Sequence, residues 1–238
     1  MKISTNKILP EYPSTLHLPY KPNTKGDKVA SEFDVAPIFI GPITCIQEKI
    51  DGANCGMAYI DGHPVLRSRT KILRKGQELK NPSKAQFGAA WNWMHQREKA
   101  FKNLNDCGPY SIYGEWMVQQ HGMAYDDLPD WFIGYDIYDW EKSQFVDPHK
   151  AQQCARNCGF EFVRNSFYAD PTLNKPLTYE FIKECANYDS WYTAQKREGV
   201  IVKVSDGEFI THRFKMVREG FDQGCLLGDE IKKNKLGV

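Results

Sequence analysis

The sequence predicts an α+β domain that consists mostly of antiparallel β-sheet, with helices at its periphery. Short apolar runs of strand length are joined in pairs by Asp-Gly turns, at 61–62 and at 206–207, which favours hairpins. Three segments with helix start signals lie between these runs. No internal repeat and no linker is visible. We therefore expect residues 1–238 to form a single domain.

The composition fits a globular chain that can bury a core. Of 238 residues 41% are hydrophobic, including 13 Phe, 12 Tyr and 6 Trp. The formal net charge of +1 gives no global attraction for a polyanion, so such a site requires local clustering of basic residues. The N-terminus lacks the apolar core of a signal peptide, and no run approaches the roughly 18 apolar residues of a membrane span. We expect a cytoplasmic monomer without a membrane partner.

The seven cysteines are scattered along the chain. None forms a Cys-x-x-Cys pair. Cys154 and Cys158 are four apart, but no second pair with zinc-site spacing accompanies them, so we expect them on one helix face. Reduced thiols are the expected state in the cytosol.

The first 42 residues are rich in proline, and Pro37 is one of six that interrupt any long element. We expect an extended segment packed over the domain. His17 in this segment has two interpretations: a core histidine with a backbone partner, or a residue at a substrate surface.

The next segments predict strands and one long helix. An apolar strand begins at Ile43, and a hairpin over 57–69 is expected to bring Arg67 or Arg69 beside it. The basic residues after this hairpin suit a solvated loop or a polyanion surface. Asn81 and Pro82 are typical of a helix start, and an aromatic stripe at helical spacing extends the helix to Gly108. Inner strands are expected at 110–117 and 131–139.

The remaining elements follow in the same way. Helices are predicted from Asp147 to Gly159 and from Thr178 to Asn187, with one or two further turns over 189–196. A buried strand at 197–204 and a return strand at 208–217 complete the sheet. The return strand should place Ile210, His212, Phe214 and Met216 on one face. The polar stretch 229–238 is expected to be a frayed end.

One stretch carries a distinctive chemistry: Glu48-Lys49-Ile50-Asp51-Gly52-Ala53-Asn54. A lysine at the end of a strand, followed by Asp-Gly, fits either an ordinary turn or a nucleophile at the mouth of a cleft. Cations and carboxylates at other strand ends would suit a nucleoside triphosphate and a divalent metal. An ordinary lysine has a pKa of about 10.4. Neighbouring cations, here a metal ion with Lys203 and Lys215, lower the pKa of a lysine and stabilise phosphoryl charge.

In these segments the chain resembles the covalent nucleotidyltransferases, which include ATP-dependent DNA ligases, RNA ligases and mRNA capping enzymes. Residues 48–52 match the family's nucleotide-accepting Lys-x-Asp-Gly motif. Five further segments resemble the later motifs in family order: 68–70, 113–116, 132–137, 198–203 and 214–218. Glu48, Asn54 and Ser68-Arg69-Thr70 are similar to the RNA ligase 2 branch. The Pro-Ser-Thr-Leu-His-Leu segment at 13–18 and the Tyr-Gly-Glu-Trp motif at 113–116 resemble a set of small bacterial and phage RNA ligase-like proteins.

The resemblance implies a role for each matching residue. Lys49 would take AMP from ATP as a phosphoramide, a lysyl-AMP, with Asp51 and Gly52 completing its motif. Lys203 and Lys215 would grip the α-phosphate, and Glu198 would help to hold Mg²⁺ or Mn²⁺. Glu48 would read the adenine edge and Tyr135 would stack on the adenine face. Glu115 would bind the ribose. Arg69 and Asn54 would position the ribose, the phosphates or the acceptor end.

The resemblance further implies an RNA-repair ligase that joins 3′-OH and 5′-phosphate RNA ends through adenylylated RNA. The host cytoplasm is the expected location if a phage encodes it. Val217 stands where the family often has a second lysine, and Arg218 is a candidate substitute. Only 20 residues follow Arg218, too few for an OB domain, so a separate RNA-binding or end-healing partner is expected. The alternatives are a DNA ligase core and an inactive nucleotidyltransferase fold that binds nucleic acid.

Overall fold

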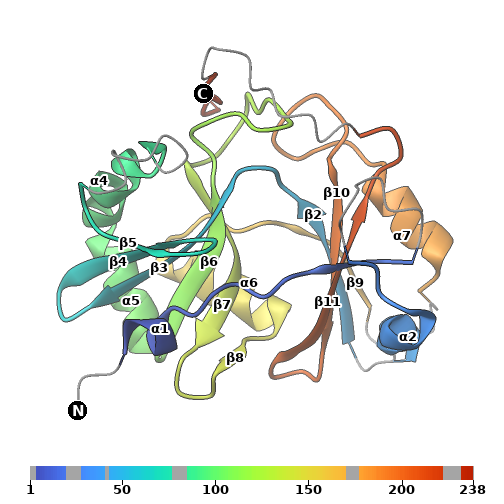
Figure 1. Cartoon of the computed structure of the whole chain (residues 1–238), viewed down its shortest axis with the longest axis horizontal. Coiled ribbons are helices and arrows are strands. Elements are labelled where there is room, and N and C mark those ends of the chain that lie inside the picture. The colour runs from blue at the N-terminus through green and yellow to red at the C-terminus, as the bar shows by residue number, and fades with distance from the viewer. Residues whose placement is uncertain are drawn as a thin grey trace. The chain divides into compact units, whose positions relative to one another are not determined.

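The computed structural model describes residues 4–19, 28–40, 43–76, 85–169, 177–221 and 232–237. It confirms the α+β fold class, with two mainly antiparallel sheets and helices (Figure 1). The chain divides into two compact units. Unit one comprises Met1–Pro13, Gly52–Gln119 and Asp130–Phe162, and unit two comprises Ser14–Asp51, Gln120–Pro129 and Val163–Val238.

Unit one is built on a six-stranded sheet whose neighbours are all antiparallel. In sheet order the strands are β5 (Ile72–Leu73), β4 (His63–Ser68), β3 (Ala53–Ile60), β6 (Tyr110–Trp116), β7 (Phe132–Asp139) and β8 (Gln144–Phe145). The predicted aromatic strands are β6 and β7. Both lie inside the sheet, as their apolar sequences require.

The hairpin of β3 and β4 forms as predicted. Asp61 and Gly62 have φ angles of 49° and 77°, the left-handed conformation that a tight two-residue hairpin turn requires. The hairpin expected to bring Arg67 or Arg69 beside the Lys49 strand does not pair with that strand, because β4 pairs with β3 and β5 while the Lys49 strand belongs to the other sheet. Arg67 is buried and donates to the Leu9 carbonyl at 2.8 Å.

The helices of unit one are α1 (Thr5–Ile8), α4 (Gly88–Gln96), α5 (Glu98–Cys107) and α6 (Pro148–Cys158). The single helix expected before Gly108 is therefore two helices, broken at Arg97 with φ −110°. Arg97 bonds Asp130 at 2.6 Å and lies over the Trp93 ring, and these contacts hold the break. The predicted start at Asn81 and Pro82 lies outside the described residues.

The aromatic stripe of these helices is core, as expected. Phe87, Trp91, Met94, Phe101 and Leu104 are all buried in one cluster with the inner strands. The start of α6 is also as predicted, since the Asp147 carboxylate accepts the N–H groups of His149 and Lys150. Gly159 ends this helix with φ 94°, a left-handed conformation that favours glycine.

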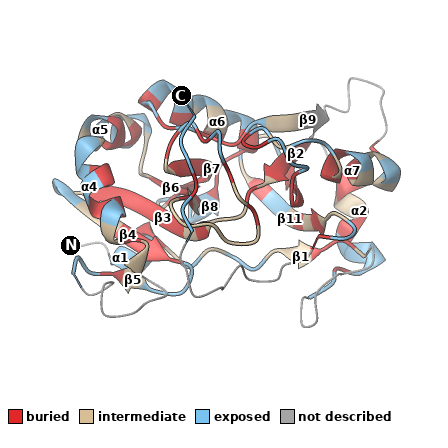
Figure 2. Ribbon diagram, turned by 90° about the horizontal axis from the view of Figure 1, so that it is seen from above, coloured by how far each residue is buried: buried red, intermediate tan, exposed pale blue. Residues whose placement is uncertain are grey.

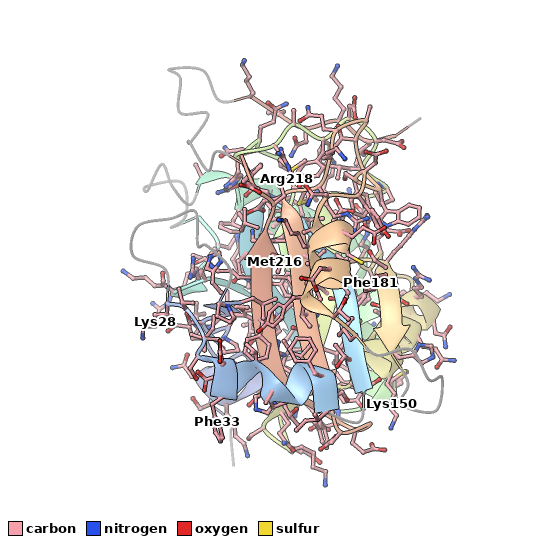
Figure 3. All side chains as sticks on the ribbon, turned by 90° about the vertical axis from the view of Figure 1, so that its right-hand side faces the viewer. Lys28, Phe33, Lys150, Phe181, Met216 and Arg218 are labelled. Carbon is pink, nitrogen blue, oxygen red and sulfur yellow. The ribbon has the colours of Figure 1, made fainter. Side chains whose placement is uncertain are left out.

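Unit two is built on a five-stranded sheet (Figure 3). In sheet order the strands are β1 (Leu16–His17), β11 (Ile210–Val217), β10 (Gly199–Ser205), β2 (Ile43–Lys49) and β9 (Asn165–Ala169). All neighbours are antiparallel except β1 and β11. Of the predicted β11 face, Phe214, Met216 and Ile210 are buried, whereas His212 is exposed.

The helices α2 (Glu32–Ile40) and α7 (Tyr179–Ala186) pack on this sheet and share its core cluster (Figure 3). Helix α2 corrects the expectation of an extended N-terminal segment, because Pro37 lies inside it. Ser31 and Asp34 cap its start reciprocally: Asp34 N–H donates to the Ser31 hydroxyl, and Ser31 N–H donates to the Asp34 carboxylate. This capping stabilises the first turn and offsets the one backbone bond that Pro37 removes.

Two further expectations for unit two were wrong. Residues 189–196 form a closed loop rather than helical turns, since Asp189 bridges Lys196 and Ser190 N–H donates to the Gln195 carbonyl. The described tail, 232–237, is docked on residues 120–129 rather than frayed. Asn234 is 3% exposed, and its side-chain oxygen accepts the Tyr125 N–H at 2.9 Å.

Burial follows the sheets and the helix faces that cover them, and exposed residues follow the outer helix faces (Figure 2). Within the described part of the chain, no helix is both long and apolar enough to cross a membrane.

Candidate active site

Lys49 lies at the end of β2, where its amine forms an ion pair with a buried carboxylate. The Nζ atom lies 2.6 Å from Glu198 Oε2, and the side chains are 21% and 2% exposed respectively. The antiparallel register explains the contact: Lys49 is opposite Gly199, so Glu198 directly precedes the strand across from the lysine. Two segments 149 residues apart thus meet at one end of the sheet.

Glu198 is the electrostatic centre of this cluster. Burial raises its pKa, the charge of Asp51 also raises it, and Lys49 and Lys215 oppose the shift. Three other predicted residues, Lys49, Asp51 and Lys215, therefore lie within electrostatic reach of Glu198. The ion pair with Glu198 stabilises the charged form of Lys49, which is not nucleophilic. The amine thus needs a change in its surroundings before it can attack.

Asp51 is held by a segment that the sequence did not single out. Its backbone N–H donates to the Tyr125 hydroxyl at 2.9 Å. Its carboxylate accepts the N–H groups of Gly122 and Met123. Burial raises the pKa of Tyr125 well above its ordinary value, so this hydroxyl stays protonated and serves as a neutral acceptor.

Glu48 points away from this cluster because neighbouring side chains alternate along a strand. It is 2% exposed. Its carboxylate accepts the Ser190 hydroxyl at 2.6 Å and the Trp191 N–H at 3.0 Å. Burial raises its pKa, and these two bonds and Arg197 oppose that shift. Each carboxylate oxygen can accept a second bond, so the contacts leave capacity for an amino group of a ligand.

The other two predicted lysines lie on β10, which pairs with the Lys49 strand, and on β11, the next strand of the sheet. Lys203 is 1% exposed, and its amine donates to Gln47 Oε1 at 2.5 Å. Lys215 lies opposite His17 in the register of β11 and β1. His17 is 2% exposed, which places it inside the unit beside a predicted phosphate ligand.

Arg218, the candidate substitute for the missing second lysine, lies just beyond β11 (Figure 3). Its backbone N–H donates to the Glu198 carbonyl, and its Nε donates to the Arg197 carbonyl at 2.9 Å. The guanidinium lies over the Phe221 ring. These contacts tie Arg218 to the backbone that carries Glu198.

The predicted ribose and base residues form a second group, in unit one. Asn54 and Glu115 are opposite each other on β3 and β6. The Asn54 amide donates to the Tyr135 hydroxyl. Burial, followed by the charge of Glu115, raises the Tyr135 pKa. The group therefore combines an amide, a carboxylate and an aromatic ring on adjacent strands.

Gly52 is required by packing in the same unit. A Cβ at this position would lie 2.6 Å from Met117 Sδ and 3.1 Å from the Trp116 carbonyl oxygen. The last residue of the Lys-x-Asp-Gly motif thus allows a close approach of backbone to β6. Arg69 lies in the exposed turn after β4.

The donor set of the first group fits a divalent metal. Glu198 and Asp51 are carboxylates, and their charges interact. Oxygen ligands of this kind suit Mg²⁺ and Mn²⁺. The Glu198 carboxylate is also desolvated, which makes a compensating cation favourable.

Sequence reasoning missed the residues that support the site: Gln47, Gly122, Met123, Tyr125, Ser190, Trp191 and Asn234. Most come from loops without periodicity. The only local signal was chemical, since a buried Glu48 and a turn aspartate require hydrogen-bond donors from somewhere in the chain.

Comparison with known proteins agrees with the motifs. The sequence model of the family described as RNA ligase matches residues 43–217. No curated protein sequence is significantly similar to this chain.

Solved structures of a Naegleria gruberi RNA ligase are similar in fold. The structure with PPi has a TM-score of 0.61 and 22% identity, covering 93% of this chain and 62% of that one. A variant with ATP and Mn has a TM-score of 0.60 and 21% identity, covering 79% and 54%. A variant with AMP and Mn has a TM-score of 0.57 and 19% identity. The chain thus spans less than two thirds of the length of these proteins.

Proposed function

The chain belongs to the RNA ligase family, and we propose that it is an ATP-dependent RNA ligase that works through a lysyl-AMP at Lys49. The observation that carries this proposal is the placement of Lys49 against the buried Glu198 carboxylate, with Asp51 and Lys215 in electrostatic reach. The ATP, AMP, PPi and Mn bound to the similar Naegleria structures support the choice of nucleotide and of a divalent metal.

In the proposed first step, the Lys49 amine attacks the α-phosphorus of ATP. A nitrogen–phosphorus bond forms, the bond from phosphorus to the bridging oxygen breaks, the amine loses its proton, and pyrophosphate leaves. Lys215 would offset negative charge on the phosphoryl group. Lys203 already donates to Gln47, so its approach to phosphate would require the exchange of that bond.

Glu198 and Asp51 would hold the divalent metal, which supplies positive charge beside the phosphates when it is bound. As a metal ligand, the Glu198 carboxylate would stabilise the Lys49 ammonium less. Lys49 could then lose its proton more readily. This accounts for an amine that is charged in the ion pair and nucleophilic only with its substrates.

The remaining proposed roles concern the nucleoside and the acceptor. Glu48 has unused acceptor capacity for the adenine amino group, and Tyr135 offers a ring for stacking, worth about 1–3 kcal/mol per base. Glu115 and Asn54 offer hydrogen bonds to a ribose. The AMP would then pass to a 5′-phosphate on RNA, and attack by a 3′-OH would form the phosphodiester and release AMP.

The test is incubation of the purified chain with ATP or GTP labelled at the α-phosphate, with Mg²⁺ or Mn²⁺. We expect covalent label from ATP that Lys49→Ala and Lys49→Arg both lose. The arginine variant keeps the positive charge beside Glu198, so its failure separates nucleophilicity from charge. Lys142→Ala, at an exposed lysine of unit one, is the matched control and should label like the wild type.

The second stage offers the labelled protein 5′-phosphorylated RNA or DNA with an adjacent 3′-OH end. Transfer to RNA and sealing of RNA support the proposal. Transfer of the label to nicked DNA but not to RNA would mean that the chain is a DNA ligase core instead. If neither ATP nor GTP labels the wild-type protein, the fold is an inactive nucleotidyltransferase and the enzymatic proposal is wrong.

A further inference from the structure

Three cysteines from two helices converge in unit one, at a place that the proposed ligase chemistry does not use. Cys107 is the last residue of α5, Cys158 is the last residue of α6, and Cys154 lies one turn earlier on α6. Their Sγ atoms all lie within 4.8 Å of one another. The Cys107 and Cys158 sulfurs are 3.8 Å apart.

These separations suit sulfur ligands around one metal ion. Two sulfurs of a tetrahedral zinc site, each about 2.3 Å from the metal, lie about 3.8 Å apart. The Cys107–Cys158 pair already has this spacing. The other separations, all within 4.8 Å, need to close by no more than about 1 Å to match.

The fold holds the three thiols together without a ligand. Helices α5 and α6 share one core cluster, and the rings of Phe101 and Phe160 pack edge to face with centroids 4.9 Å apart. Both helices also end at the cluster. The C-terminal end of a helix carries a partial negative charge, which favours a nearby cation.

Exposure leaves the cluster open to an incoming ion. Cys107 is exposed, Cys154 is half-buried and Cys158 is buried. Asp106 is also exposed, and its charge acts on Cys158. An ion can therefore enter from solvent, and water can occupy a fourth position beside three protein ligands, as in open zinc sites.

Two other uses of the cluster fit less well. Burial and the neighbouring Cys107 thiol raise the pKa of Cys158 to about 11, and thiols with raised pKa values are poor nucleophiles. A disulfide between Cys107 and Cys158 would leave Cys154 without a role, whereas a thiophilic cation uses all three sulfurs.

We propose that Cys107, Cys154 and Cys158 form a trithiolate site for one thiophilic metal ion of the Zn²⁺ class. The site is distinct from the Glu198 carboxylate site, whose oxygen ligands suit Mg²⁺ or Mn²⁺. Its contribution is to clamp the ends of α5 and α6. Because the packed core already aligns the helices, we expect the metal to raise the melting temperature without being required for folding.

The test uses the full, untagged chain, reduced and stripped of metal, and titrated with Zn²⁺ against a chromophoric chelator. Titration with Cd²⁺ adds the ultraviolet thiolate-to-metal charge-transfer band as a direct readout. We expect one equivalent of metal per chain. Loss of a residue that only hydrogen-bonds a metal ligand typically weakens metal binding about 10–100-fold. Cys107→Ala and Cys154→Ala each remove a ligand, so each should weaken metal binding by more than that.

Cys185→Ala is the matched control, because Cys185 is a buried cysteine of α7 in unit two, and it should bind like the wild type. Equal binding by the wild type and the Cys107→Ala variant would overturn the proposal. So would a disulfide between Cys107 and Cys158 in the isolated protein, seen as five free thiols among the seven cysteines. Neither measurement involves a nucleotide, so its result is independent of ligase activity.

Discussion

The hydroxyl of Tyr125 accepts the backbone N–H of Asp51 at 2.9 Å. Tyr125 is itself held by the tail, since Asn234 accepts its N–H and the Lys235 N–H donates to its carbonyl. A chain of hydrogen bonds thus runs from the last residues of the described structure to the Lys-x-Asp-Gly motif. Its members all lie in unit two, so the order of the tail bears on the position of Asp51.

Tyr125→Phe should remove the acceptor of the Asp51 N–H and leave that group unsatisfied. We expect unfolding free energy to fall by about 1–3 kcal/mol, and formation of the covalent nucleotide adduct to slow. Chemical denaturation and single-turnover labelling measure the two effects. Tyr188→Phe, which removes an exposed hydroxyl bonded to Glu184, should change neither. A Tyr125→Phe variant with wild-type stability and labelling would show that the contact is dispensable.

Asn234→Ala should loosen the tail. The buried Asn234 side chain is the acceptor of the Tyr125 N–H, so its loss should cost about 1–3 kcal/mol. Proteolysis at the C-terminus should become faster, and adduct formation should slow as in Tyr125→Phe. Lys233→Ala changes an exposed side chain beside it and serves as the control. Additive effects of Asn234→Ala and Tyr125→Phe would contradict a shared chain of contacts.

Glu48 predicts a pH dependence of stability. Burial raises its pKa in the folded protein above the ordinary value of 4.5, so the folded state binds this proton more tightly than the unfolded chain. The associated stability is present below the ordinary pKa and is lost as pH rises through the folded pKa. The wild type should therefore lose stability relative to Glu48→Gln as pH rises from about 4.5. Denaturation at stepped pH measures this, and a difference that grows in favour of the wild type would mean that the pKa is lowered.

Gly52→Ala should strain the motif. The added methyl group meets Met117 Sδ and the Trp116 carbonyl, and overpacking of this kind costs about 1–3 kcal/mol. In a Met117→Ala background the same glycine substitution should cost less, because that background lacks the sulfur but keeps the carbonyl. Thermal unfolding of the single and double variants checks this. If Gly52→Ala costs the same in both backgrounds, the strain comes from the contact with the Trp116 carbonyl rather than with the Met117 sulfur.

Asp147→Ala should weaken the start of α6. Its carboxylate accepts two N–H groups of the first turn, and loss of such a cap costs about 0.5–2 kcal/mol. Glu161→Ala, at an exposed side chain beyond the same helix, is the control. Hydrogen exchange should show faster opening of the first turn of α6. Unchanged exchange there would mean that the cap is not limiting.

Local patterns predicted the elements well where local chemistry decides them. The turn at Asp61-Gly62 and the caps at Asp147 and Thr178 depend on residues that are close in sequence, and all form as predicted. The misses have tertiary causes. The break at Arg97 rests on Asp130, and helix α2 persists through Pro37 because it packs in the core of unit two.

The α+β class, most strands and their turns, and the order of motifs that identifies the RNA ligase family can be read from the amino-acid sequence. These depend on periodicity, turn chemistry and residue identity, which are local. Which residues meet is known only from the folded chain. The register of β2 and β10 sets Lys49 against Glu198, the docked tail holds Tyr125 beneath Asp51, and the packing of α5 on α6 brings Cys107 to Cys154 and Cys158. Such contacts join segments far apart in the chain, and no local pattern specifies their pairing.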